Sequence, residues 1–185
     1  MVSVIKKTLH HPKANHQARI NFQNRLQQYK KSAKTLVYLD ESGFAHDMPR
    51  THGYCKKGLR CYGKQDWHAK GRVNAIGAII GMTFLTVCLF QGSVNSDVFY
   101  AWLTQDLLPK VPDNAVIIMD NASFHKRTDM VAAIEQRGAI LDYLPAYSPD
   151  LNPIEQKWAQ AKAIRRQYRC TVDDLFSIYL QYDTL

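Results

Sequence analysis

The spacing of apolar residues along the chain predicts where its helices and strands lie. Apolar residues recur at helical spacing among polar ones over residues 14–33, which predicts an amphipathic helix. Short runs that are continuously apolar or rich in β-branched residues predict strands at 35–40, 72–80, 83–90, 115–119 and 139–144. Helical spacing and capping residues predict further helices at 95–108, 126–136, 152–168 and 172–182.

The order of these elements predicts an α/β fold with a mixed sheet of about five strands flanked by helices. Three strands come first, and helices and strands then alternate. Only Gly81-Met82 separates 72–80 from 83–90, which predicts an antiparallel pair. Residues 45–70 are polar and punctuated by glycine, which suits short strands or a hairpin.

No segment predicts a membrane span or an exported protein. The longest apolar stretch, residues 73–90, is interrupted by Asn74, two glycines and two threonines, and it suits two buried strands. The N-terminus lacks the apolar core and the cleavage site of a secretory signal, which predicts a cytoplasmic protein. The four cysteines form no C-x-x-C pair, so we expect reduced thiols.

Positive charge is concentrated in three segments of the chain. The formal net charge is +8, and residues 1–39 contain eight basic residues and no acid. Residues 50–72 contain seven basic residues against Asp66 alone, and residues 157–169 contain five with no acid. Such segregation is typical of a protein with a polyanion partner, although a solvated surface explains the charge alone equally well. Trp67 lies in the second segment, where it can stack on an unpaired base or pack in a core.

Three acidic residues occupy positions that suit an active site. Asp40 and Asp120 each end a predicted apolar strand, and Glu155 lies in the first turn of a predicted helix. A buried charge without a partner is costly, whereas side chains at strand ends commonly face a crevice in α/β sheets. Carboxylate oxygens suit Mg²⁺, and a pair of such ions suits phosphodiester chemistry. We therefore expect the three acids to converge on divalent ions.

Each acid also has a structural interpretation. Asp40 and Asp120 both precede turn-forming residues, so each can serve in a turn. Glu155 can complete a capping box with Asn152 at the start of its helix. Taken singly, none of the three acids identifies an active site.

Two neighbouring acids compete for the same role. In an extended strand Glu41 points to the opposite face from Asp40 and cannot easily share its metal. Asp150 lies in the loop before Glu155 and is the competing third ligand, but the turn formers beside it favour a turn role.

Three blocks of sequence resemble the bacterial mariner-like transposases, the insertion sequence six-thirty group. The blocks are residues 38–44 (YLDESGF), 118–126 (IMDNASFHK) and 144–155 (LPAYSPDLNPIE). Residues 121–154, 34 in all, separate the second and third acids, which is the spacing of that family. The resemblance begins near residue 4 and covers nearly the whole chain.

The resemblance implies an RNase H-like catalytic domain over 35–185, preceded by a basic helical lead-in at 1–34. It implies that Asp40, Asp120 and Glu155 bind two Mg²⁺ or Mn²⁺ ions. The implied reaction is hydrolysis at transposon ends, followed by attack of the freed 3′-hydroxyls on target DNA, typically at a TA dinucleotide.

The same blocks contain three auxiliary candidates: Asn121, His125 and Lys126. His125 can orient a phosphate or a water near the metals, or it can be a packing histidine at a helix start. Lys126 can contact DNA.

The resemblance also bears on partners and on alternative functions. Full-length relatives carry an N-terminal helix-turn-helix DNA-binding region, which residues 1–34 cannot contain. We therefore expect either a second reading frame joined by frameshifting to a separately encoded helix-turn-helix domain, or a truncated remnant, and we expect a homo-oligomer on DNA. An RNase H-like nuclease without strand transfer and an inactive, non-specific DNA-binding fragment remain alternatives, and the presence of all three acids favours an enzyme.

Overall fold

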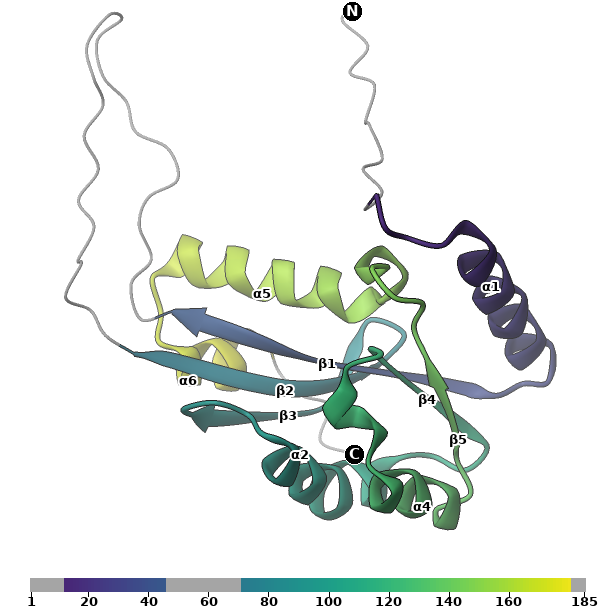
Figure 1. Ribbon diagram of the computed structural model, residues 1–185. Helices are drawn as coiled ribbons and strands as arrows, with labels where there is room; N and C mark the ends of the chain where they lie inside the picture. The colour runs from purple at the N-terminus through teal and green to yellow at the C-terminus, as the bar shows by residue number, and fades with distance from the viewer. Residues whose placement is uncertain (1–11, 46–70, 181–185) are drawn as a thin grey trace, which may run out of the picture.

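The computed structural model describes residues 12–45 and 71–180. Five strands in these residues form a mixed sheet in the order β3-β2-β1-β4-β5 (Figure 1). They are β1 (Thr35–Ala45), β2 (Arg72–Ile80), β3 (Thr83–Gln91), β4 (Ala115–Met119) and β5 (Ile140–Tyr143). β1 and β3 are antiparallel to β2, whereas β1 and β5 are parallel to β4. The predicted mixed sheet is confirmed, as is the antiparallel pair around Gly81.

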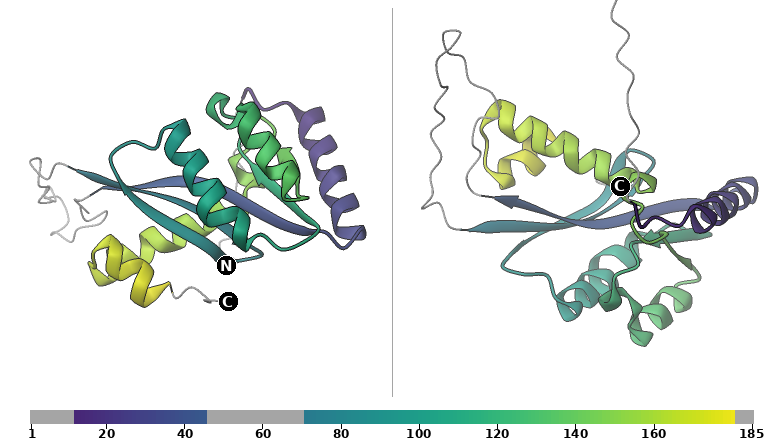
Figure 2. Two further views of the ribbon diagram at one scale, coloured as in Figure 1. Left: turned by 90° about the horizontal axis from the view of Figure 1, so that it is seen from below. Right: turned by 45° about the horizontal axis from the view of Figure 1, so that its top comes forward.

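Helices cover both faces of the sheet (Figures 1 and 2). α5 (Pro153–Tyr168) and α6 (Val172–Asp174) pack on one face, and α2 (Ser96–Trp102) and α4 (Thr128–Gln136) pack on the other. α1 (His16–Lys31) lies beside the β5 edge, where Arg25 donates two hydrogen bonds to Asp142 of β5. Shorter elements are a π-helical turn (Leu103–Leu107), α3 (Leu108–Lys110), 3-10 helices at Ser123–Lys126 and Pro149–Leu151, and a π-helical turn at Leu175–Tyr179.

Each face of the sheet has its own apolar core, because side chains alternate along β1. Tyr38 and Phe44 point into the core beneath α5 and α6. Val37 and Leu39 point into the core beneath α2 and α4. Even-numbered residues of this strand therefore face α5, and odd-numbered residues face the other helices.

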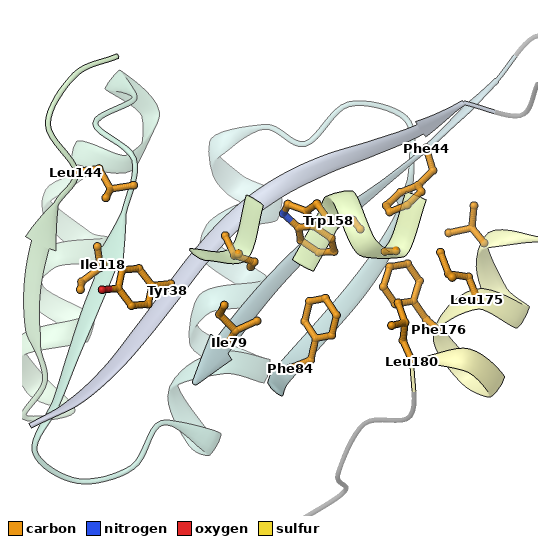
Figure 3. Close-up of a cluster of buried hydrophobic side chains, with 14 of the residues drawn as sticks. Tyr38, Phe44, Ile79, Phe84, Ile118, Leu144, Trp158, Leu175, Phe176 and Leu180 are labelled. Atoms are coloured by element: carbon orange, nitrogen blue, oxygen red, sulfur yellow. The ribbon is translucent and has the colours of Figure 1, made fainter. Parts of the chain in front are cut away.

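Trp158 lies at the centre of the core beneath α5 (Figure 3). Three rings surround it, with centroids 5.3 to 6.3 Å away: Phe44, Phe84 and Phe176. A Cβ on Gly77 of β2 would lie only 2.7 Å from Trp158 Cη2. Glycine thus lets the indole lie directly on the sheet, and this packing sets the position of α5 and of Glu155 in its first turn.

β1 is longer than predicted, and Asp40 lies within it rather than at its end. Its parallel pairing with β4 stops at Tyr38, but its antiparallel pairing with β2 continues to Ala45. Ser42-Gly43, the turn-forming residues that follow the predicted strand, are part of that ladder. Backbone pairing with a neighbouring strand outweighs the local turn preference of these two residues.

The remaining predictions differ in outcome. The helix expected at 14–33 is present as α1, and Gly138 ends the helical segment after α4 with a positive φ of 80°. The helix expected at 172–182 is shorter and gives way to the π-helical turn at Leu175–Tyr179.

Cys88 and Cys170 are free thiols, as predicted. The hairpin or short strands expected at 45–70, with Trp67, Cys55 and Cys61, lie outside the described residues. In the described part of the chain no helix is long and apolar enough to cross a membrane.

Candidate active site

The parallel pairing of β1 and β4 brings Asp40 and Asp120 together. The two strands pair in register, starting with Thr35 opposite Ala115. Continuing that register puts Asp40 opposite Asp120, which directly follows β4. Two acids far apart in the sequence are thus placed at neighbouring positions.

Glu155 joins them from the first turn of α5. Asp40, Asp120 and Glu155 all line one cavity of about 360 Å³. The other lining residues are Asn121, Ala122, residues 144–149 and Asn152. The structure therefore brings the three predicted acids to one cavity, from a strand, a loop and a helix.

Burial and nearby negative charge raise the pKa of Asp40 to about 8. Burial is the largest cause, followed by the charges of Glu155, Glu41 and Asp120. Without a bound cation, the Asp40 carboxyl therefore holds its proton near neutral pH. A divalent cation in the cavity would offset the repulsion and favour the carboxylate.

Asp120, by contrast, is held in its ionised form. Its Oδ1 lies 2.6 Å from His125 Nδ1 and accepts a hydrogen bond of 3.0 Å from the backbone N–H of Ala122. The hydrogen bond with His125 is the largest cause that lowers the pKa of Asp120. The contact with Ala122 is of the Asx type, so the turn role suggested by the sequence coexists with a place in the cavity.

His125 is a buried imidazole between two carboxylates. Its side chain is 1% exposed, and its Nε2 lies 3.1 Å from Glu41 Oε1. Burial on its own would lower the pKa of His125, but the hydrogen bonds to Asp120 and Glu41 outweigh it and raise the pKa to about 9. The ring is therefore protonated at neutral pH and donates from both nitrogens. Of the other auxiliary candidates, Asn121 lines the cavity, and both Asn121 and Lys126 are exposed.

The residues of the cavity fit a divalent ion by their chemistry. Carboxylate oxygens are the ligands that Mg²⁺ and Mn²⁺ prefer. In the part of the chain that the structure describes, no three Asp, Glu, His or Cys side chains are already grouped tightly enough to hold a metal. The three acids nevertheless share one cavity, and a bound cation would offset the burial and the mutual repulsion that together raise the pKa of Asp40.

Comparison with known proteins identifies the family. The family described as DDE superfamily endonuclease matches residues 35–175. The chain belongs to this family. No curated protein sequence matches it.

The fold of this DDE superfamily endonuclease is RNase H-like and matches that of Mos1 mariner transposase. The Mos1 catalytic domain superposes with a TM-score of 0.55 at 15% identity, over 84% of this chain and 76% of that chain. The Mos1 strand transfer complex gives 0.68 at 17% identity, over 96% and 59%. The Mos1 paired-end complex with Mg also gives 0.68 at 17% identity, over 88% and 53%. The chain thus spans little more than half the length of the Mos1 chains in these complexes.

Asp150, the acid that competes with Glu155, lies outside the residues that line the cavity of this endonuclease. Arg19 of α1 donates to both of its carboxylate oxygens, at 2.9 and 2.6 Å. The bidentate pair ties the loop before α5 to α1. This contact supports a structural role for Asp150 at the short 3-10 helix that contains it.

We expect Asp150→Asn to leave catalysis nearly unchanged. The Asp150 side chain is 47% exposed, so losing its ion pair with Arg19 should cost about 1 kcal/mol of stability or less. DNA cleavage in Mg²⁺ and thermal unfolding should be measured side by side with the unmodified protein. A loss of cleavage as large as that of a Glu155→Gln variant would transfer the role of third acid to Asp150.

Glu155 is not part of a capping box. Asn152 is the N-cap residue of α5, but its side chain makes no capping hydrogen bond. The side chain is buried instead, and its Nδ2 lies 3.5 Å from the carbonyl oxygen of Leu39 in β1. Packing against β1 thus takes the place of the local cap, and the Glu155 side chain faces the cavity with the other two acids.

Sequence reasoning missed the contact between Glu41 and His125. Strand alternation predicts that Glu41 and Asp40 face opposite sides of β1, but it does not say what Glu41 meets there. The sequence offered one signal for this contact, a protonatable histidine five residues after Asp120. Only the tertiary structure brings the 3-10 helix that contains His125 close enough to β1 for His125 to contact Glu41.

Proposed function

We propose that this chain is the catalytic core of a cut-and-paste DNA transposase related to the bacterial mariner-like, insertion sequence six-thirty group. It cleaves transposon ends and joins the freed 3′-hydroxyls to target DNA, with TA as the target dinucleotide. The observation that carries the proposal is the single cavity lined by Asp40, Asp120 and Glu155. Membership of the DDE superfamily endonucleases and the fold shared with Mos1 transposase support it.

Asp40, Asp120 and Glu155 would hold two Mg²⁺ or Mn²⁺ ions. Mos1 complexes have been solved with each of these metals. When bound, such ions activate the attacking oxygen and stabilise the leaving oxygen of the phosphodiester. The chain itself keeps Asp120 ionised through His125, and a bound cation would favour the ionised form of the second acid, Asp40.

DNA would approach the three acids from the exposed side of the cavity. Asn121 lines the cavity, Lys126 is exposed in the 3-10 helix that follows, and both are candidates to contact the phosphate backbone. The basic segment 157–169 serves two purposes. Arg165 is buried and donates to the carbonyl of Ala45, whereas Arg166 is exposed and available to DNA. The charge excess is therefore partly structural and partly suited to a polyanion.

Two kinds of partner are part of the proposal. The first is a helix-turn-helix domain that recognises the transposon ends. Two or more copies of the chain assemble on DNA, and the protein acts in the cytoplasm on the chromosome.

A strand-transfer assay tests the proposal. Labelled duplexes from the DNA that flanks the gene, with a free 3′-hydroxyl at the presumed end, are incubated with the protein, a plasmid target and Mg²⁺. Joined products with TA at the junction are the expected result. Nicked products without joining would replace the proposal with an RNase H-like nuclease, and DNA binding with neither product would replace it with an inactive DNA-binding fragment.

A further inference from the structure

We propose that Glu41 and His125 are positioning residues that orient the Asp120 carboxylate from the opposite side of the sheet. We call the chain of contacts Glu41, His125 and Asp120 the acid–histidine bridge. The inference rests on the proposed function in one respect, namely that Asp120 is a metal ligand.

The bridge begins on the face of β1 that points away from the cavity. Leu39, two residues before Glu41, points into the core beneath α2 and α4, so the alternation of the strand puts Glu41 on that same face. Asp40 points to the other face and lines the cavity with Glu155. Adjacent residues of one strand thus serve the same site from opposite sides.

His125 spans the distance from Glu41 to Asp120. Nδ1 lies 2.6 Å from Asp120 Oδ1, and Nε2 lies 3.1 Å from Glu41 Oε1. The Phe99 ring packs against the imidazole with centroids 4.4 Å apart, and the Tyr143 hydroxyl donates to the His125 carbonyl oxygen at 2.9 Å. The side chain and the backbone of His125 are therefore both held in place.

The bridge determines which oxygen of Asp120 faces a ligand. His125 and the backbone N–H of Ala122 both contact Oδ1. Within the described residues Oδ2 has no hydrogen-bond partner, and the Asp120 side chain is 50% exposed and lines the cavity. One oxygen is thus anchored by the protein, and the other is left to bind a cation. Hydrogen-bonded partners of ligating groups typically change metal affinity 10- to 100-fold when they are removed.

Three substitutions of Glu41 distinguish the effect of its hydrogen bond with His125 from the effect of its negative charge. Glu41→Ala removes both. Glu41→Asp keeps the charge but shortens the side chain, so the carboxylate no longer reaches Nε2. Glu41→Gln removes the charge but keeps an oxygen that accepts from Nε2. If the contact orients Asp120, Glu41→Ala and Glu41→Asp should weaken Mn²⁺ binding roughly 10- to 100-fold, and Glu41→Gln should stay within a few-fold of the unmodified protein.

Mn²⁺ binding to the full chain without DNA, followed by electron paramagnetic resonance, is the primary measurement. The Mn²⁺ concentration for half-maximal DNA cleavage should rise in parallel, with the rate at saturating Mn²⁺ largely restored. Glu135→Ala, an exposed acid of α4, is the matched control and should bind Mn²⁺ as the unmodified protein does. Thermal unfolding identifies any variant that fails to fold, and Glu41→Asp then carries the test in place of Glu41→Ala.

Two results would overturn the inference, and both can be distinguished from a failure of the proposed function. In the first, Glu41→Ala and Glu41→Asp bind Mn²⁺ as tightly as the unmodified protein. In the second, Glu41→Gln loses affinity while Glu41→Asp retains it, which would mean that Glu41 acts through its charge alone. If instead the unmodified protein bound no Mn²⁺, or Asp120→Ala left binding unchanged, the proposed function itself would fail.

Discussion

Asp120→Ala should abolish metal-dependent DNA cleavage, with a loss of at least about a thousandfold, or roughly 4 kcal/mol of transition-state stabilisation. The reason is that Asp120 is the acid of the cavity that is already ionised and oriented, through His125 and the backbone of Ala122. No other acid follows β4 closely enough to replace it. Salt-dependent DNA affinity should change little, because it depends on basic residues elsewhere.

The measurement is the single-turnover rate of end cleavage in Mg²⁺, together with DNA binding over a range of salt concentrations. Asp113→Ala is a matched control, because the Asp113 side chain is 94% exposed and pairs with Arg137 away from the cavity. Asp120→Asn should lose cleavage as well while preserving more of the local hydrogen bonding. Cleavage that survives in both Asp120 variants would remove the assignment of the active site.

Asp40→Asn should stabilise the metal-free protein at pH 8 and above by roughly 4–6 kcal/mol. The pKa of Asp40 is raised from 3.8 to about 8 in the folded protein, with burial as the largest cause. Between these two pH values the folded state binds more protons than the unfolded state, so the free energy of unfolding falls as the pH rises. The asparagine side chain is neutral and similar in shape, and therefore avoids this loss.

Urea unfolding from pH 4 to pH 9 in the presence of a chelator measures the effect. The two proteins should be nearly equal at pH 4 and should diverge towards pH 8, and Asp113→Asn should follow the unmodified protein. Added Mn²⁺ should raise the unfolding temperature of the unmodified protein more than that of Asp40→Asn, because a cation stabilises the state that binds it. If the free energy of unfolding changed with pH in the same way for Asp40→Asn and the unmodified protein, burial of Asp40 would not destabilise the folded state.

Together the two predictions indicate an active site that lowers the stability of the metal-free protein. Asp40 is kept in an unfavourable environment, with Glu155, Glu41 and Asp120 near it. Such destabilisation is typical of functional sites, where residues suited to a ligand are poorly suited to the empty protein. Removing Asp40 should therefore stabilise the protein and inactivate it at once.

Local sequence patterns were sufficient for most elements of the fold, and they singled out three acids that the structure brings to one cavity. The periodicity of apolar residues predicted the strands and most helices, because burial on one or two faces imposes a repeat that is visible in any short window. The acids Asp40, Asp120 and Glu155 stood out because each lies in or beside an element that the same patterns predict. The blocks around them pointed to a transposase family, and the match over residues 35–175 confirms that the chain is a DDE superfamily endonuclease.

Only the tertiary structure decided how these elements meet. The ladder with β2 carries β1 past Asp40 to Ala45, and the register with β4 puts Asp40 opposite Asp120. Likewise, Arg19 pairs with Asp150 and His125 joins Glu41 to Asp120 across long stretches of sequence. Periodicity reports which face of an element is buried, but it carries no information on which distant segment covers that face. That choice depends on the packing and hydrogen bonding of the whole chain.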